Sequence, residues 1–138
     1  MDAREFVAMT KQYAMDDVVE QVVKTLKAPR LPNRSKGSSG PASQWIEAHS
    51  LTKKHRSEWF NGLTEDERRM IRDILADCAE RVLASFFTLL DGVGGSYEGV
   101  FEIAAIDSMS RRNVLNPENA QMLHDIFSEV CEEGRPQS

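Results

Sequence analysis

The chain has 138 residues, of which 41% are hydrophobic and 28% are charged, and its formal net charge is −5. This length suits one domain with a real core, and no apolar run reaches the roughly 18 residues of a transmembrane helix. Residues 1–62 carry ten Lys and Arg against seven Asp and Glu, whereas residues 63–138 carry seven against fifteen. An acidic second half argues against nucleic-acid binding and favours a basic protein partner.

The chain start and the cysteines indicate the compartment. Residues 1–5 lack the basic and apolar segments of a signal peptide, so we expect a cytoplasmic protein that does not bind membranes. Cys78 and Cys131 both fall on apolar faces of expected helices. We therefore predict two buried, reduced thiols rather than a disulfide.

Residues 3–28 predict a first helix. Phe6, Met9 and Tyr13 form one apolar set, and a second set from Met15 to Leu26 continues it with a phase shift. The shift predicts a bend near residues 14–17. Prolines end this helix, and a polar, glycine-rich stretch predicts a flexible loop over about residues 29–42.

Two short helices are expected next, over residues 42–49 and 52–61. Trp45 lies in the first, and Trp59 and Phe60 lie in the second. Aromatic side chains beside a loop can anchor a partner, but we interpret these three as caps on the core.

A long helix over residues 64–91 is expected to organise the fold. Thr64 and Glu67 have the spacing of a capping box at its start. Its apolar stripe widens after Val82, which predicts that the second half is surrounded by protein. The glycine-rich run 91–95 ends the helix, and it lacks the preceding strand and the lysine of a phosphate-binding loop.

The last third predicts a small β-hairpin over residues 99–115, with a helix over 98–106 as the alternative. A final helix over 117–133 is expected, with Asn116 as its N-cap and Pro117 at its first position. Residues 134–138 are expected to form a loose tail. The predicted fold is mainly α: a single-domain helical bundle, residues 1–138, around the long central helix.

The candidate chemistry is sparse. Asp73, Asp77 and Glu80 share one face of the long helix, where they can bind a metal or act as acid and base. Pairing of Arg69 with Asp73 and of Asp77 with Arg81 is the simpler interpretation. A helical di-metal site also needs a Glu-x-x-His pair, which is missing. We therefore expect no metal, no cofactor and no catalytic residue.

His124 keeps an alternative function open. A histidine on a helix can serve as a base or a metal ligand, although such residues more often bond a neighbouring carbonyl or carboxylate. Together with Asp73, Asp77 and Glu80 it defines the alternative, a small helical metal-binding protein or enzyme with a carboxylate and histidine site.

A small, acidic, mostly helical chain without a catalytic motif resembles the immunity proteins that bacteria make against their own interbacterial toxins. The segments 86–92, 115–117 and 123–127 are also similar to a pattern in other small bacterial proteins. The resemblance implies a non-enzymatic inhibitor that binds a toxin domain stoichiometrically. A toxin domain with a basic surface is the expected partner, and we expect six carboxylates to contact it: Asp73, Asp77, Glu80, Glu129, Glu132 and Glu133.

Overall fold

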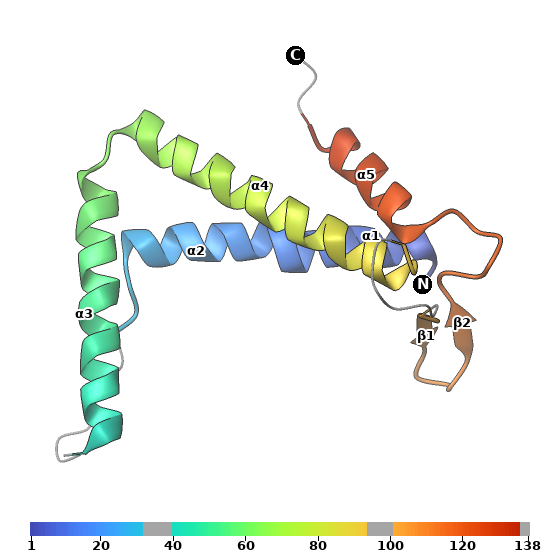
Figure 1. The fold of residues 1–138 in the computed structure, drawn as a ribbon, viewed down its shortest axis with the longest axis horizontal. Coiled ribbons are helices and arrows are strands. Elements are labelled where there is room, and N and C mark those ends of the chain that lie inside the picture. The colour runs from blue at the N-terminus through green and yellow to red at the C-terminus, as the bar shows by residue number, and fades with distance from the viewer. Residues whose placement is uncertain (32–39, 94–100, 136–138) are drawn as a thin grey trace. The chain divides into compact units, whose positions relative to one another are not determined.

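The structure is a computed structural model that describes residues 1–31, 40–93 and 101–135. Its elements, in chain order, are α1 (Ala3–Lys11), a π-helix η1 (Gln12–Asp16), α2 (Asp17–Lys27), α3 (Pro41–Gly62), α4 (Glu65–Leu90), β1 (Ala104–Ile106), β2 (Arg112–Val114) and α5 (Leu123–Glu133) (Figure 1). The mainly α fold is confirmed. Much of the expected 29–42 loop, Gly94, Gly95, the first residues of the expected hairpin and the end of the tail lie outside the described residues.

The chain divides into two compact units. The first contains Met1–Asp17 and Ala76–Ser138, and the second contains Val18–Leu75. The first has six Lys and Arg against fifteen Asp and Glu, a net charge of −9; the second has eleven against seven, a net charge of +4. We call them the acidic unit and the basic unit. None of the helices in the described ranges is long and apolar enough to cross a membrane.

The phase shift in the first helical segment takes the form of a π-helix, Gln12–Asp16. Val7 and Met15 lie in the same core cluster, although eight residues in an α-helix would place them about 80° apart. The π-helix accommodates one extra residue and so returns Met15 to within about 20° of Val7. Tyr13 is 68% exposed, so its predicted place in the apolar set is wrong.

The two short helices predicted over 42–49 and 52–61 are one helix, α3. The hydroxyls of Ser50 and Thr52 donate to the carbonyls of Ile46 and Ala48 at 2.7 and 3.0 Å, so polar residues at the expected break bond within the helix instead. Phe60 is fully buried, but Trp45 and Trp59 are mostly exposed, which contradicts their predicted role as caps on the core.

Side chains of α3 hold the end of α2 in the basic unit. The Lys27 carbonyl accepts hydrogen bonds from the Ser57 hydroxyl at 3.3 Å and from the Asn61 amide at 3.0 Å. Terminal carbonyls of a helix lack partners within it, so these donors satisfy one of them. Ser57 is itself buried, so its hydrogen bond to α2 is shielded from water.

Both ends of α4 follow the sequence prediction. The Thr64 amide donates to the Glu67 carboxylate at 2.8 Å, and the Glu67 amide donates to the Thr64 hydroxyl at 3.3 Å. At the other end Gly92 has a φ of 72°, its amide donates to the Leu89 carbonyl, and the Val93 amide donates to the Thr88 carbonyl. These two bonds form a Schellman motif, which needs the left-handed conformation that glycine adopts without strain.

The core of the acidic unit centres on Phe87 of α4. Its ring lies 5.3 Å from that of Phe127 on α5 and 6.2 Å from that of Phe6 on α1, the latter in an edge-to-face arrangement. The buried residues of this cluster are Val7, Met15, Leu83, Phe87, Leu123, Ile126, Phe127 and Cys131. α1, α4 and α5 therefore share one apolar core, as expected for amphipathic helices.

The predicted hairpin is confirmed over residues 104–114. Ala104 pairs with Val114 and Ile106 with Arg112 in an antiparallel register. The Asp107 carboxylate accepts hydrogen bonds from the amides of Met109 and Arg111, which fixes the turn.

The predicted N-cap of the last helix is wrong. Asn116 accepts from the Ile103 amide and donates to the Phe101 carbonyl, both at 2.7 Å, so it extends the hairpin instead. Helix α5 begins six residues later than predicted, at Leu123. Its first amides donate to a carboxylate from the end of α4: Leu123 to Asp91 Oδ1 at 3.0 Å, and His124 to Asp91 Oδ2 at 2.9 Å.

We expect Asp91→Ala to lower the free energy of unfolding by about 2 kcal/mol, since it removes the carboxylate that accepts hydrogen bonds from the amides of Leu123, which is buried, and His124, which is half-buried. Urea unfolding followed by circular dichroism measures the change. Asp125→Ala, an exposed acid in the first turn of the same helix, is the matched control and should change stability far less. Equal effects of the two substitutions would contradict the capping role.

Candidate functional site

Asp91 and His124 form a largely buried polar contact in the acidic unit. The Asp91 side chain is 3% exposed, and its Oδ2 lies 2.8 Å from His124 Nδ1. This contact is a hydrogen bond to an ionised carboxylate when His124 carries its hydrogen on Nδ1. The His124 Nε2 lies 3.4 Å from Asp125. The contact between Asp91 and His124 thus stabilises the start of α5. This is the structural role that the sequence analysis gave as the alternative to catalysis for His124.

The carboxylates of α4 do not form the predicted pairs. Arg69 pairs with Asp66 at 3.2 Å rather than with Asp73. Glu80 pairs with Arg135 of the acidic unit at 2.9 Å. Asp73 and Asp77 are exposed, and neither has an ion-pair partner within residues 1–31, 40–93 and 101–135. Both side chains are therefore available to a partner.

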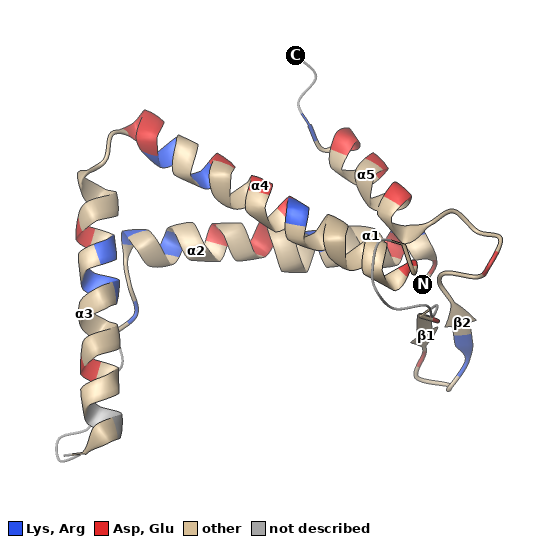
Figure 2. Ribbon diagram, in the orientation of Figure 1, with Lys and Arg blue, Asp and Glu red and all other residues tan. Residues whose placement is uncertain are grey.

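The carboxylates at the end of α5 are partly neutralised from α1. Arg4 bonds Glu129 at 3.0 Å and Glu133 at 2.5 Å. Hydrogen bonds from Gln121 and Arg4 hold the pKa of Glu129 below its ordinary value. Glu132 is exposed and has no such partner in the described part of the chain. Figure 2 shows the acidic residues that follow one another along α5.

Within the described ranges, the structure shows no assembled site for the alternative hypothesis, a metal-binding protein or enzyme. No group of three His, Cys, Asp or Glu side chains is positioned to hold a metal ion there. Cys131 is buried, and burial, with Glu80 adding to it, raises the pKa of its thiol. Cys78 is exposed, so its predicted burial is wrong. The metal-binding or enzymatic alternative stays a prediction, and no arrangement of described side chains supports it.

α4 has a second apolar stripe that the described residues of the acidic unit leave exposed. Val82 is 68% exposed, Phe86 44%, Leu89 45%, and Val93, just beyond the helix end, 41%. Val82, Phe86 and Leu89 are spaced by four and three residues, which places them on one stripe of the helix, and Val93 follows the helix end. Leu83 and Phe87, which lie about 100° further round the helix than Val82 and Phe86, are buried in the core. The prediction that protein surrounds this half is wrong for the chain by itself. We call these four residues the exposed α4 face.

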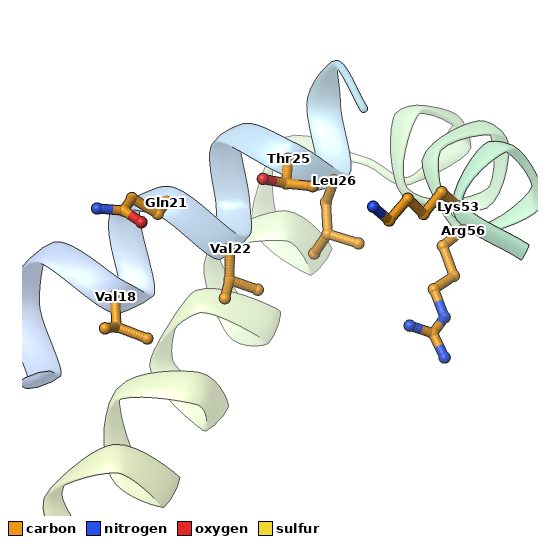
Figure 3. Close-up of a pocket in the computed structure, with 7 residues that line it drawn as sticks. All are labelled: Val18, Gln21, Val22, Thr25, Leu26, Lys53 and Arg56. Atoms are coloured by element: carbon orange, nitrogen blue, oxygen red, sulfur yellow. The ribbon is translucent and has the colours of Figure 1, made fainter. Parts of the chain in front are cut away.

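A groove lies between α2 and α3 in the basic unit. It has a volume of about 300 Å³ and is lined by Val18, Gln21, Val22, Thr25 and Leu26 of α2 and by Lys53 and Arg56 of α3. Figure 3 shows Val18, Val22 and Leu26 following one another along α2, with Lys53 and Arg56 beyond the Leu26 end. Periodicity in the sequence indicated an apolar face on α2, but not that a basic rim from α3 would border it.

The comparisons with known proteins add no relative: no family model, curated protein or solved structure matches the chain. The interpretation of both apolar surfaces therefore depends on their own geometry and charge.

We expect one of the two thiols to react with Ellman's reagent in the native protein, and both to react in denaturant. Cys78 is exposed, whereas Cys131 is buried and its raised pKa leaves less thiolate at pH 8. A Cys78→Ser control should remove the fast reaction. If both thiols of the native wild-type protein reacted fast with Ellman's reagent, the burial of Cys131 would be contradicted.

Proposed function

We propose that this protein is a non-enzymatic inhibitor that works in the cytoplasm by occupying the surface of a protein partner, in the manner of an immunity protein. The observation that carries the proposal is the exposed α4 face. Isolated exposed apolar residues are ordinary, but a row of them on a helix that already places a neighbouring stripe in the core is typical of an interaction surface. Val82 and Phe86 are the expected anchors.

The charge distribution supports a basic partner. The acidic unit, which carries the exposed α4 face, has a net charge of −9. Opposite charge on the partner would accelerate association, while the apolar anchors would slow dissociation. The resemblance to immunity proteins suggests the kind of partner, a toxin domain with a basic surface. Blocking by occupancy predicts complete inhibition at a one-to-one molar ratio, and a titration of toxin activity measures it.

We expect Val82→Asp and Phe86→Asp each to weaken partner binding by roughly 30-fold, because each places a carboxylate where an apolar anchor would be desolvated. A photo-crosslinking amino acid at position 82 would first identify the partner, and isothermal titration with the purified partner would then measure affinity. Ile106→Asp is the matched control: Ile106 is as exposed as Val82 but lies on the hairpin.

Two outcomes would end the proposal. One is that Ile106→Asp weakens binding as much as Val82→Asp, since the exposed α4 face would then have no special role. The other is that the protein sizes as a dimer by light scattering and that Val82→Asp converts it to a monomer. The exposed α4 face would then be a self-association surface rather than an inhibitory one.

Charge reversal tests the acidic contribution separately. Asp73→Lys, Asp77→Lys and Glu132→Lys alter carboxylates that hold no described ion pair, so the fold should be unaffected. Each should slow association by roughly threefold at low ionic strength, and the effect should fade at high salt. Glu118→Lys makes the same change in net charge at an exposed position outside the six candidates. If Glu118→Lys slows association equally, only net charge matters and the assignment of these carboxylates as partner contacts is wrong.

A further inference from the structure

We propose that the groove between α2 and α3 is a second binding site, which takes an acidic amphipathic helix from a protein partner. The groove combines an apolar floor with a basic rim. Val18, Val22 and Leu26 are four residues apart and form one row along α2, while Lys53 and Arg56 border the row at its Leu26 end (Figure 3).

The floor has the length and chemistry of a helix-docking surface. The row from Val18 to Leu26 spans about 12 Å, or a little over two helical turns. Val18 is 44% exposed and Val22 37%, so covering them would remove apolar surface from water. A docked helix would place its own apolar side chains, spaced three and four residues apart, against this row.

The rim selects for negative charge. Neither Lys53 nor Arg56 forms an ion pair with the residues that the structure describes. Their neighbour Lys54 does, with Glu58 at 3.8 Å, and Lys54 does not line the groove. Lys53 is half-buried, so a carboxylate beside it would be less screened by solvent than at an open surface. The occupant is therefore a helix with carboxylates near the end that meets Lys53 and Arg56.

A helix fits the groove better than a small amphiphile does. The groove has apolar side chains on its α2 side only, because α3 contributes the two cations. Small-molecule sites usually enclose most of the ligand, and an alkyl chain lying here would keep one side in water. A docked helix would shield its own apolar side chains and those of α2 from water, and its polar face would remain in contact with solvent. This inference is independent of the proposed inhibition, since it concerns the basic unit and a partner of opposite charge.

The test is a selection of displayed helical peptides against the full-length protein, followed by fluorescence polarisation with one enriched peptide. We expect the enriched sequences to share apolar residues spaced three and four apart and Asp or Glu near one end. Lys53→Glu should lower the affinity for the chosen peptide about tenfold. Lys54→Glu is the matched control, with the same charge change one residue away, and should leave the affinity within about twofold. Val22→Glu should abolish binding.

Four results would overturn the proposal. If the enriched peptides lacked acidic residues, the basic rim would not select the occupant. If Lys53→Glu and Lys54→Glu lowered the affinity equally, the effect would be a non-specific electrostatic attraction. Binding of laurate that depends on Lys53 and Val22, without binding of any peptide, would make the occupant an alkyl carboxylate. Light scattering provides the remaining check: a dimer that Lys53→Glu dissociates would make the occupant a second copy of the chain.

Discussion

The fold of the acidic unit depends on the Asp91 carboxylate at the start of α5. That helix is only 11 residues long, a length at which isolated helices are marginal in water. It nevertheless supplies four of the buried core residues: Leu123, Ile126, Phe127 and Cys131. Two of its first amides find their acceptor in Asp91, which follows directly after α4. Asp91 thus joins the end of the long helix to the start of the last one, and both helices contribute to the core around Phe87.

The caps explain how far the fold could be predicted. Thr64 and Glu67 lie three residues apart, so their reciprocal bonds could be read from the sequence and are present. Asp91 is 32 residues from Leu123, and Asn61 is 34 from Lys27. No local pattern indicates a cap supplied from that distance. Asn116 before Pro117 had every local sign of an N-cap, but the hairpin uses its side chain, because tertiary partners compete with local ones.

The sequence predicted the sign of the charge on each half of the chain, but it did not predict which ion pairs form or which apolar residues stay exposed. Charge counts along the sequence indicated an acidic second half, and the compact units separate the charge further. The pairs predicted on α4 did not form at four-residue spacing: Arg72 pairs with Glu20 and Glu80 with Arg135. Flexible side chains choose among several neighbours with similar energies, so spacing alone is a weak guide. Hydrophobic periodicity indicated an apolar stripe on α4 that widens after Val82, but it cannot tell which part of that stripe the chain itself covers.

The π-helix has a consequence for how this chain can change in length. A regular helix cannot lose a residue without rotating everything beyond the loss by about 100°. The segment Gln12–Asp16 already accommodates one residue more than an α-helix needs. If one residue there were deleted, the segment would close into an ordinary α-helix with Val7 and the present Met15 still on the same face of the core. Natural variants one residue shorter at this point would therefore keep their packing, whereas the same deletion within α4 would rotate Phe87 out of the core.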